Sequence, residues 1–382
     1  MYNPEQKQDL LLFYKIKKIP AVFMFFSMAI FFCGVLILFS ASKGNFYPWA
    51  YKHLLNFILA LPIFFIIILT DIRVWFKLTY FLYAAGLLLL IAVKFMGVEG
   101  GLGAQRWLAI GGFRFQPSEL VKVFLVLALA RYYHNLHLNH LHKLYSLFVP
   151  LALIGIDAAL VLIQPNLGTA AIICLVGGTI FFTTGISYKK IIFVVIVIGC
   201  TLPVLWANMH EYQKRRVHTF LNPESDPLGA GYNIIQSKIA IGSGGITGKG
   251  FLKGSQSQLN FVPEQQTDFI FSIVAEEFGL IGGLVVIILF SGLIWQALKI
   301  SNNCKTIYAR VTSYGMVSIL FVHVFVNIGM VTGILPVVGV PLPLISYGGS
   351  SLISSMVAIA FVVNCHIHKD LEIITEDDEE EF

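Results

Sequence analysis

The chain has 382 residues, of which 57% are hydrophobic and 12% are charged, and its mean hydropathy is +0.79. A water-soluble fold could not cover so much apolar surface, so the composition indicates a polytopic membrane protein. The net charge of +5 does not indicate nucleic-acid binding, because the basic residues are scattered around apolar runs, where they orient a protein in the bilayer.

Apolar runs of about 17 to 25 residues are long enough to cross a bilayer as helices. They predict an all-α integral membrane protein with about ten transmembrane helices. The expected spans are residues 20–40, 53–70, 76–97, 118–133, 147–164, 168–186, 190–207, 268–298, 309–332 and 345–366.

Lysine and arginine concentrate on one side of these spans, and the positive-inside rule places that side and both termini in the cytoplasm. Residues 1–19 would then form a cytoplasmic N-terminus, and residues 367–382 an acidic cytoplasmic tail. The large loop of residues 208–267, between helices 7 and 8, would be extracytoplasmic, as would the shorter 98–117 loop. No repeat is evident, so we expect one membrane domain over residues 1–382.

The shorter external loop brings Arg106 and Trp107 to the membrane edge, before Glu119 and Lys122 enter a span. Residues three apart on a helix are neighbours, so these two charges can pair, and pairing lowers the cost of burying them. Because charges inside a membrane usually face a cavity, we favour a functional role for the pair. Trp107 alone is also explained as an interfacial anchor.

The sequence QPNLGT predicts a tight turn between two spans, since Pro165 fixes its φ angle and Gly168 relaxes it. Gln164 is an amide at membrane depth and needs a hydrogen-bond partner there. We include it among the candidate supporting residues. Asp157, earlier in the same span, is a buried acid without an assigned role.

The large loop begins with the basic cluster Lys214, Arg215 and Arg216, which suits either a pyrophosphate or the anchoring of the chain at lipid headgroups. The glycine-rich stretch 242–254 does not form a nucleotide-binding P-loop, because Ser243 replaces the first glycine of that motif. The five cysteines contain no CxxC pair, so neither disulfides nor zinc are expected.

Asp268 lies where the polar loop ends and a strongly apolar run begins. A carboxylate at the mouth of a span is costly, so chemistry or transport is the default expectation. Near the C-terminus, several prolines precede LISYGGSS, which contains Ser346. This pattern is typical of a broken helix beside a cavity, and equally of small residues that permit tight helix packing.

Nine motifs, spread in order over nearly all the spans, closely resemble the SEDS family of bacterial cell-wall proteins. They are GAQRWL, FQPSELVK, QPNLGT, DPLGAGYN, QSKIAIGSGG, KGFLKGSQSQLNF, VPEQQTDFIF, AEEFG and PLPLISYGGSS. The version around Asp268 is more similar to the rod-shape branch of the family than to the division branch. Two departures are Gln266, where the family often has histidine, and Asn166, where it often has aspartate.

The resemblance implies a peptidoglycan glycosyltransferase that polymerises lipid II, a disaccharide-pentapeptide on a lipid pyrophosphate, at the outer face of the bacterial cytoplasmic membrane. It also implies a class B penicillin-binding transpeptidase as partner, other proteins of the elongation complex, and contact with membrane lipids. Asp268 corresponds to the family's proposed catalytic acid. Trp107, Glu119 and Lys122 match other positions on which the family depends. Glu264 and Ser346 lie within the matched motifs and are candidate supporting residues.

Inverting transfer from a pyrophosphate-linked donor requires a base at the attacking hydroxyl and positive charge at the leaving group. We predict that Asp268 is this base, strengthened by partial burial, or alternatively that it binds a divalent cation. No cofactor is certain. Arg106, Arg216 and Lys122 are candidates for the pyrophosphate. A lipid II transporter, a division-type polymerase and a scaffold for the transpeptidase are the competing interpretations.

Overall fold

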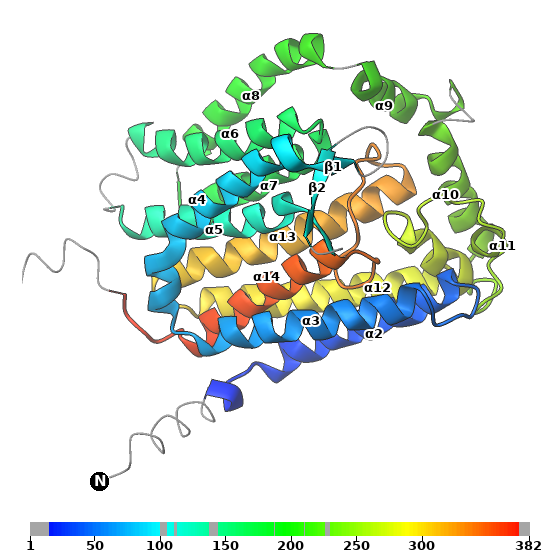
Figure 1. Ribbon diagram of the computed structural model, residues 1–382, viewed down its shortest axis with the longest axis horizontal. Helices are drawn as coiled ribbons and strands as arrows, with labels where there is room; N and C mark the ends of the chain where they lie inside the picture. The colour runs from blue at the N-terminus through cyan, green and yellow to red at the C-terminus, as the bar shows by residue number, and fades with distance from the viewer. Residues whose placement is uncertain are drawn as a thin grey trace, which may run out of the picture.

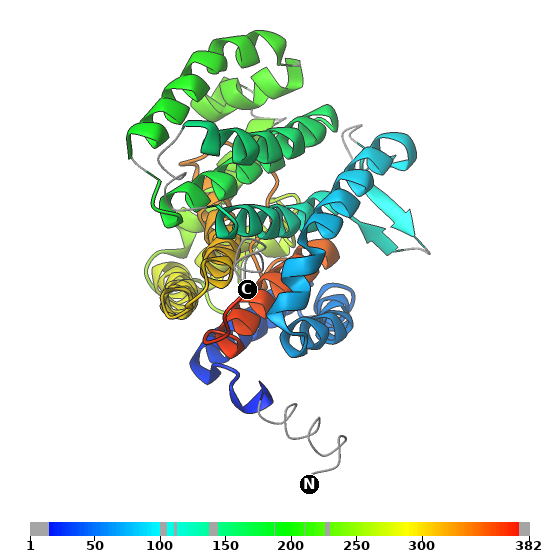
Figure 2. The same ribbon diagram turned by 90° about the vertical axis from the view of Figure 1, so that its left-hand side faces the viewer.

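The computed structural model describes residues 15–99, 105–110, 113–136, 144–186, 188–209, 211–225 and 230–373. Its long helices run side by side, and the strands and helices α10 and α11 gather at one end (Figure 1). The first and last described residues lie toward the opposite end. Viewed along the bundle, the helices at Ile270–Asn302 (yellow) and Ile307–Thr332 (orange) appear nearly end-on (Figure 2).

A helix overlaps each expected span in the described chain, so the predicted all-α membrane class is confirmed, while the number of membrane crossings stays a prediction. Within the described residues, six helices are long and apolar enough to cross a bilayer, namely α2 (Ala21–Ala41), α3 (Trp49–Leu69), α4 (Ile72–Met96), α12 (Ile270–Asn302), α13 (Ile307–Thr332) and α14 (Gly349–Ile367). The other four expected spans contain α5 (Pro117–His134), α6 (Phe148–Ile163), α7 (Leu167–Thr183) and α8 (Tyr188–Asn208).

Short polar side chains mark where several helices begin. The Asp71 carboxylate accepts a hydrogen bond from the backbone N–H of Arg73 at 2.8 Å and so caps α4. Thr306 caps α13 in the same way through the N–H of Ala309 at 3.3 Å. Gly333 ends α13 in the left-handed conformation that favours glycine.

A small antiparallel sheet, which the sequence did not predict, occupies the described part of the 98–117 loop. It consists of β1 (Val98–Glu99), β2 (Gln105–Ile110) and β3 (Phe113–Phe115) in the order β1-β2-β3. Trp107 pairs with Val98, and Leu108 pairs with Phe115. The sheet packs against α4 and leads directly into α5.

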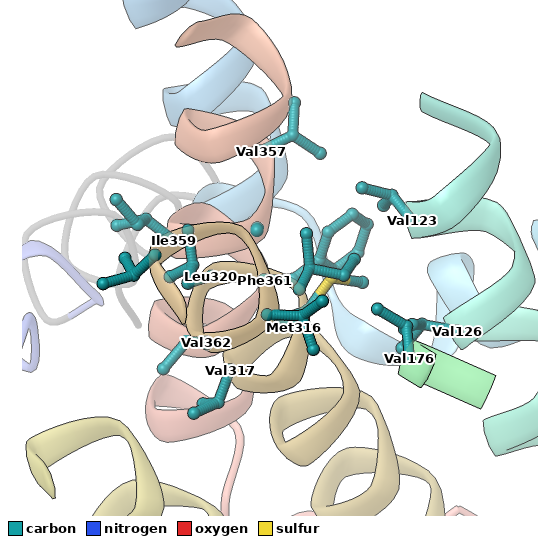
Figure 3. Close-up of a cluster of buried hydrophobic side chains, with 14 of the residues drawn as sticks. Val123, Val126, Val176, Met316, Val317, Leu320, Val357, Ile359, Phe361 and Val362 are labelled. Atoms are coloured by element: carbon teal, nitrogen blue, oxygen red, sulfur yellow. The ribbon is translucent and has the colours of Figure 1, made fainter. Parts of the chain in front are cut away.

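The centre of the bundle is an apolar core built from α5, α7, α13 and α14 (Figure 3). Val126, Met316 and Leu320 are each no more than 1% exposed. Gly315 lets α13 approach α5 closely, because a Cβ at that position would lie 2.3 Å from a methyl carbon of Val126. The bundle is therefore densely packed along its middle.

The large loop contains further helices, namely α9 (Glu211–Leu221), the 3-10 turn η3 (Pro223–Ser225), α10 (Ala230–Gly244) and α11 (Ser255–Gln258). Another 3-10 turn, η2 (Leu144–Leu147), lies earlier in the chain and leads into α6. Helix α10 packs on α12 and α13. Its Ser237 is fully buried and donates to the carbonyl of Val331 on α13 at 3.0 Å. This helix extends the bundle at the end that carries the sheet.

Helix α12 is broken at Gly279, whose φ of 65° and ψ of −157° are not helical. Backbone groups of residues 245–250 enter the break. The N–H of Leu280 donates to the carbonyl of Gly245 at 2.9 Å, and the N–H of Gly250 donates to that of Glu277 at 2.9 Å. The large loop thus supplies hydrogen bonds that an unbroken helix would have made internally.

Buried acids next to this break also bind the large loop. The Glu276 carboxylate accepts from the Lys249 ammonium at 2.7 Å and from the backbone N–H groups of Gln256 at 2.8 Å and Ser257 at 3.0 Å. Glu277 accepts from the Ser40 hydroxyl of α2 at 2.5 Å. Both acids are 0% exposed, so Glu276 attaches the loop to the bundle interior, while Glu277 attaches α12 to α2.

Candidate active site

A cavity of about 360 Å³ opens at the end of the bundle that carries the sheet. Its wall combines β2, the first turns of several helices, and two irregular segments. The lining residues are Arg106, Trp107, Gln116, Glu119, Asn166, Thr169, Ile172, Glu264, Thr267, Asp268, His323, Val338, Gly339, Val340, Pro341, Tyr347, Gly348 and Ser351.

Three helices begin at this cavity. Gln116 and Glu119 lie at the start of α5, Asn166 and Thr169 at the start of α7, and Gly348 just before α14. The unpaired N–H groups in the first turn of a helix, together with the helix dipole, favour negative charge. These helix starts therefore favour an anionic group at their part of the wall, whereas Glu119, Glu264 and Asp268 bring negative charge to other parts of it.

Arg106 adds a formal positive charge to this end of the bundle. It is half-buried on β2, and its guanidinium donates to the carbonyl of Pro165, in the turn before α7, at 2.6 Å. Trp107 follows it on the same strand and also lines the cavity. The sheet therefore places the guanidinium and an aromatic ring at the cavity wall.

Asp268 precedes α12, and its backbone is fixed by a buried amide. The Asn327 side chain of α13 donates to the carbonyl of Asp268 at 2.8 Å and to that of Val340 at 2.7 Å. Ser346 fixes the adjacent residue, since its hydroxyl donates to the carbonyl of Thr267 at 2.5 Å. These hydrogen bonds hold the backbone of Asp268 in place although the residue lies outside regular secondary structure.

The segment between α13 and α14 approaches the Asp268 carboxylate closely at Gly339. A Cβ on Gly339 would lie 3.3 Å from Oδ2 of Asp268, and the φ of Gly339 is +71°. A side chain at this position would be strained and would crowd the carboxylate.

Glu119 and Lys122 form the predicted ion pair, with 2.8 Å between Nζ and Oε1. Lys122 is 0% exposed and is not part of the cavity wall, so it does not reach a ligand as we expected for a pyrophosphate-binding lysine. Its Nζ also lies 2.7 Å from Nε2 of His323, which does line the cavity. Lys122 thus lies behind the wall, between Glu119 and His323, which both line the cavity.

The structure places the remaining candidates differently. Glu264 is exposed at the cavity mouth, where its carboxylate accepts from the Thr267 hydroxyl at 3.2 Å. Gln164 lies outside the lining, and its amide donates to the carbonyl of Leu90 on α4 at 3.0 Å, which supplies the partner that membrane depth requires. The backbone of Arg216 lies in α9, and its side chain is outside the described residues.

Sequence reasoning missed His323 and Asn327. A signal was present, since these two polar residues lie four apart in an otherwise apolar run and therefore share one face of a helix. It missed the role of Gly339 as well, because a glycine among prolines indicates a turn but not what approaches it.

A divalent cation would find some of its preferred ligands here. Glu119, Glu264 and Asp268 supply carboxylate oxygens to one cavity, although no group of three His, Cys, Asp or Glu side chains within the described residues is arranged to hold a metal. Mg²⁺ commonly takes only one or two protein carboxylates, the rest being water and substrate phosphate. The residues therefore fit a cation bound together with a phosphate-bearing substrate.

Comparison with known proteins places this fold and cavity in a family. The chain is 49% identical to the peptidoglycan glycosyltransferase MrdB of Escherichia coli K12 over 292 residues, which cover 76% of this chain and 78% of the relative. Its structure resembles a chain from a study of how a peptidoglycan synthase complex coordinates polymerization and crosslinking, at 32% identity and a TM-score of 0.80, covering 93% and 99% of the two chains.

The crystal structure of the rod shape determining protein RodA of Thermus thermophilus is similar too, with 26% identity, a TM-score of 0.68 and coverage of 92% of this chain and 97% of that chain. The apolar helices indicate a multi-pass membrane protein. The family model described as "cell cycle protein" for FtsW, RodA and SpoVE matches residues 17–371. The chain therefore belongs to the FtsW/RodA/SpoVE family, which is the SEDS family that its motifs resembled.

Proposed function

We propose that this protein is a peptidoglycan glycosyltransferase that extends glycan strands by consuming lipid II and releasing undecaprenyl pyrophosphate. Family membership and the likeness to MrdB support the reaction class. The observation that carries the proposal is one cavity in which a braced carboxylate, Asp268, faces an environment built for an anion, with Arg106 and three helix starts.

The reaction forms a bond between an acceptor sugar oxygen and the anomeric carbon of the donor. The bond from that carbon to the pyrophosphate oxygen breaks, and its electron pair leaves with the pyrophosphate. The acceptor hydroxyl loses its proton, which we assign to the Asp268 carboxylate. Attack opposite the leaving group converts an α donor into a β-1,4 linkage, as in other inverting transfers.

Positive potential stabilises the pyrophosphate as it leaves. Arg106 lines the cavity and can donate several parallel N–H bonds to phosphate oxygens. The first turns of α5, α7 and α14 add the partial positive charge of their N–H groups. Lys122 is assigned to Glu119 instead, since it is 0% exposed.

A divalent cation is the alternative role for Asp268. It would neutralise charge on the pyrophosphate, with Asp268 and one further cavity carboxylate among its ligands. Under either assignment, Asp268 must carry negative charge and stay where Asn327 and Ser346 hold it.

We assign the cavity to the outer face of the bacterial cytoplasmic membrane, with both termini in the cytoplasm. The support is charge, because the connections at the opposite end carry most of the lysine and arginine. Lipid-linked saccharide can then enter from the outer leaflet. The large loop, residues 208–267, would lie on the same side as the cavity.

A class B penicillin-binding transpeptidase is the proposed partner, and elongation with maintenance of rod shape is the proposed cellular task. The structural likeness to a chain of a peptidoglycan synthase complex supports the first, and the likeness to a rod shape determining protein supports the second. Other proteins of the elongation complex are expected to bind as well.

Transport of lipid II is less well supported. A translocation path would have to continue from the cavity toward the other end of the bundle. The side chains of Val126, Met316 and Leu320 are buried in the apolar core at the middle of the bundle (Figure 3).

The test is polymerisation of purified lipid II by the purified chain with its transpeptidase partner, whose crosslinking is blocked by a β-lactam. We expect long glycan from the native protein and loss of about a hundredfold or more in rate for Asp268→Asn. Glu224→Gln is the matched control, since it removes an exposed carboxylate of η3 that is not part of the cavity wall. Native-rate synthesis by Asp268→Asn would refute the assignment. A parallel assay with a chelator distinguishes the two roles of Asp268, general base or cation ligand.

A further inference from the structure

Helix α7 turns one face of its first turns toward the cavity. Asn166, Thr169 and Ile172 all line the cavity, whereas the residues between them do not. Residues three apart lie on the same face of a helix. The side chain of Thr169 therefore points into the cavity, between those of its two neighbours on this face.

The hydroxyl of Thr169 is not used by the fold. Thr169 is 7% exposed, and its backbone N–H donates to Oδ1 of Asn166 at 3.3 Å. Its hydroxyl makes no hydrogen bond within the described residues, and it is not among the polar atoms there that are shielded from solvent. Later in α7, by contrast, the Thr179 hydroxyl donates to the carbonyl of Val176 at 2.7 Å, as threonines in helices commonly do. Thr169 thus keeps a donor available to a ligand in the cavity.

Arg106 brings positive charge to the same turn. Its guanidinium donates to the carbonyl of Pro165 at 2.6 Å, and Pro165 directly precedes Asn166, which caps α7. A guanidinium has five N–H donors, so this bond leaves others for a ligand. A hydroxyl and a guanidinium at the start of a helix are donors that suit the oxygens of a phosphate.

This turn is also held close to the candidate catalytic residue. A Cβ on Gly168 would lie 2.6 Å from Cβ of Val338, so α7 begins in tight contact with the segment before α14. The next residue of that segment, Gly339, approaches Oδ2 of Asp268. The start of α7 and the carboxylate of Asp268 therefore contact consecutive residues of one segment that lines the cavity.

We propose that Thr169 is a further substrate-binding residue, whose hydroxyl donates to a phosphate oxygen of the lipid pyrophosphate beside Arg106. The identity of this ligand rests on the proposed function. Thr169 forms no covalent bond and transfers no proton. Its role is to hold the pyrophosphate while the bond from its oxygen to the sugar breaks, so the first turn of α7 recognises the phosphate and not the saccharide.

Two variants test this role by the binding of undecaprenyl pyrophosphate, which is not turned over on its own. Thr169→Val keeps the shape of threonine without the hydroxyl, whereas Thr169→Ser keeps the hydroxyl. We expect Thr169→Val to raise Kd by about tenfold and Thr169→Ser to stay within about threefold of the native value. Neither should change Kd for undecaprenol, which has no phosphate.

Thr179→Val is the matched control, since Thr179 lies on the same helix outside the cavity wall. It should bind undecaprenyl pyrophosphate with the native Kd. If Thr169→Val does not fold, Thr169→Ala takes its place, because alanine also lacks the hydroxyl and favours helix.

Three results would overturn the proposal: an unchanged Kd without the hydroxyl, an equal rise in Thr169→Val and Thr169→Ser when both melt at the native temperature, or an equal rise for undecaprenol. The proposed reaction is tested separately. Binding that depends on Thr169, in a native protein that makes no glycan from lipid II, would refute the reaction and leave the phosphate site. Glycan synthesis with a Kd that Thr169→Val leaves unchanged would refute the site and leave the reaction.

Discussion

The side-chain amide of Asn327 links the backbone carbonyls of Asp268 and Val340, at 2.8 Å and 2.7 Å, and thereby joins the start of α12 to the segment before α14. Asn327 is 0% exposed, so its amide is held away from water. One buried amide therefore fixes the position of the candidate catalytic residue relative to the segment that contains Gly339 and Val340.

Asn327→Ala should remove the hydrogen bonds that link Asp268 to Val340. We expect a loss of about 1–3 kcal/mol in the free energy of unfolding, because two buried carbonyls lose their donor. Glycan synthesis should fall by at least about tenfold, since positional errors at a reacting group are costly in rate. Thermal unfolding in detergent and the lipid II assay measure the two effects.

Asn364→Ala is a matched control for this variant. Asn364 is also 0% exposed, and its amide donates to the carbonyls of Ile67 at 2.8 Å and Thr70 at 2.7 Å, away from the cavity. A similar loss of stability with little loss of activity in the folded protein is expected. If both variants lost activity equally, the effect of Asn327 would be one of stability alone.

Arg106→Gln should weaken the stabilisation of the leaving group. We expect kcat/KM for lipid II to fall by about tenfold or more, because a charge-assisted bond to phosphate is lost. Arg114→Gln serves for comparison, since Arg114 is exposed on β3 of the same sheet and is not part of the cavity wall. It should stay within about twofold of the native value, as exposed substitutions usually do. Equal effects of the two variants would argue against Arg106 as a phosphate ligand.

Gly279→Ala should destabilise the protein, because a Cβ would lie 2.4 Å from the backbone nitrogen of Gly248 and the φ of +65° is strained for alanine. The expected cost is at least about 1–3 kcal/mol, measured by thermal unfolding. Gly178→Ala, in α7, has open space for its Cβ and should be neutral or stabilising. A native melting temperature for Gly279→Ala would mean that α12 is continuous.

Asp157→Asn tests the transport alternative. Asp157 is 0% exposed in α6, its side chain lies against that of Tyr83 on α4, and it is not part of the cavity wall. We expect glycan synthesis within about twofold of native and little loss of thermal stability, since an amide of the same shape can keep the contact with Tyr83. Loss of a lipid II flipping activity in this variant, with polymerisation intact, would favour a transporter that uses this acid.

The sequence predicted the positions of the helices well because the apolar runs have the length that a bilayer requires and are separated by charged or proline-containing segments. It did not predict the sheet at Gln105–Ile110, because strands of six residues or fewer in a glycine-rich loop have too little periodicity to distinguish them from turns. The break at Gly279 was also missed, since GLIGG reads equally well as a surface for helix packing.

The candidate site was predicted only in part. Arg106, Glu119 and Asp268 came from charge at membrane edges and from family motifs, and the structure brings all three to one cavity. Local sequence could not indicate that Asn327 and His323 would meet them, because such contacts depend on how α13 packs against α5 and α12. Gln164 looked similar in sequence, and its partner on α4 became apparent only from the packing.

Residues 245–250 of the large loop influence how the molecule unfolds. Since its backbone completes the hydrogen bonding of α12 on both sides of Gly279, the loop cannot lift off while that helix stays intact. Any force that a partner applied to residues 245–250 would be carried by these backbone bonds into α12, whose first turn follows Asp268. Residues 245–250 and the candidate catalytic carboxylate are therefore mechanically coupled through one helix.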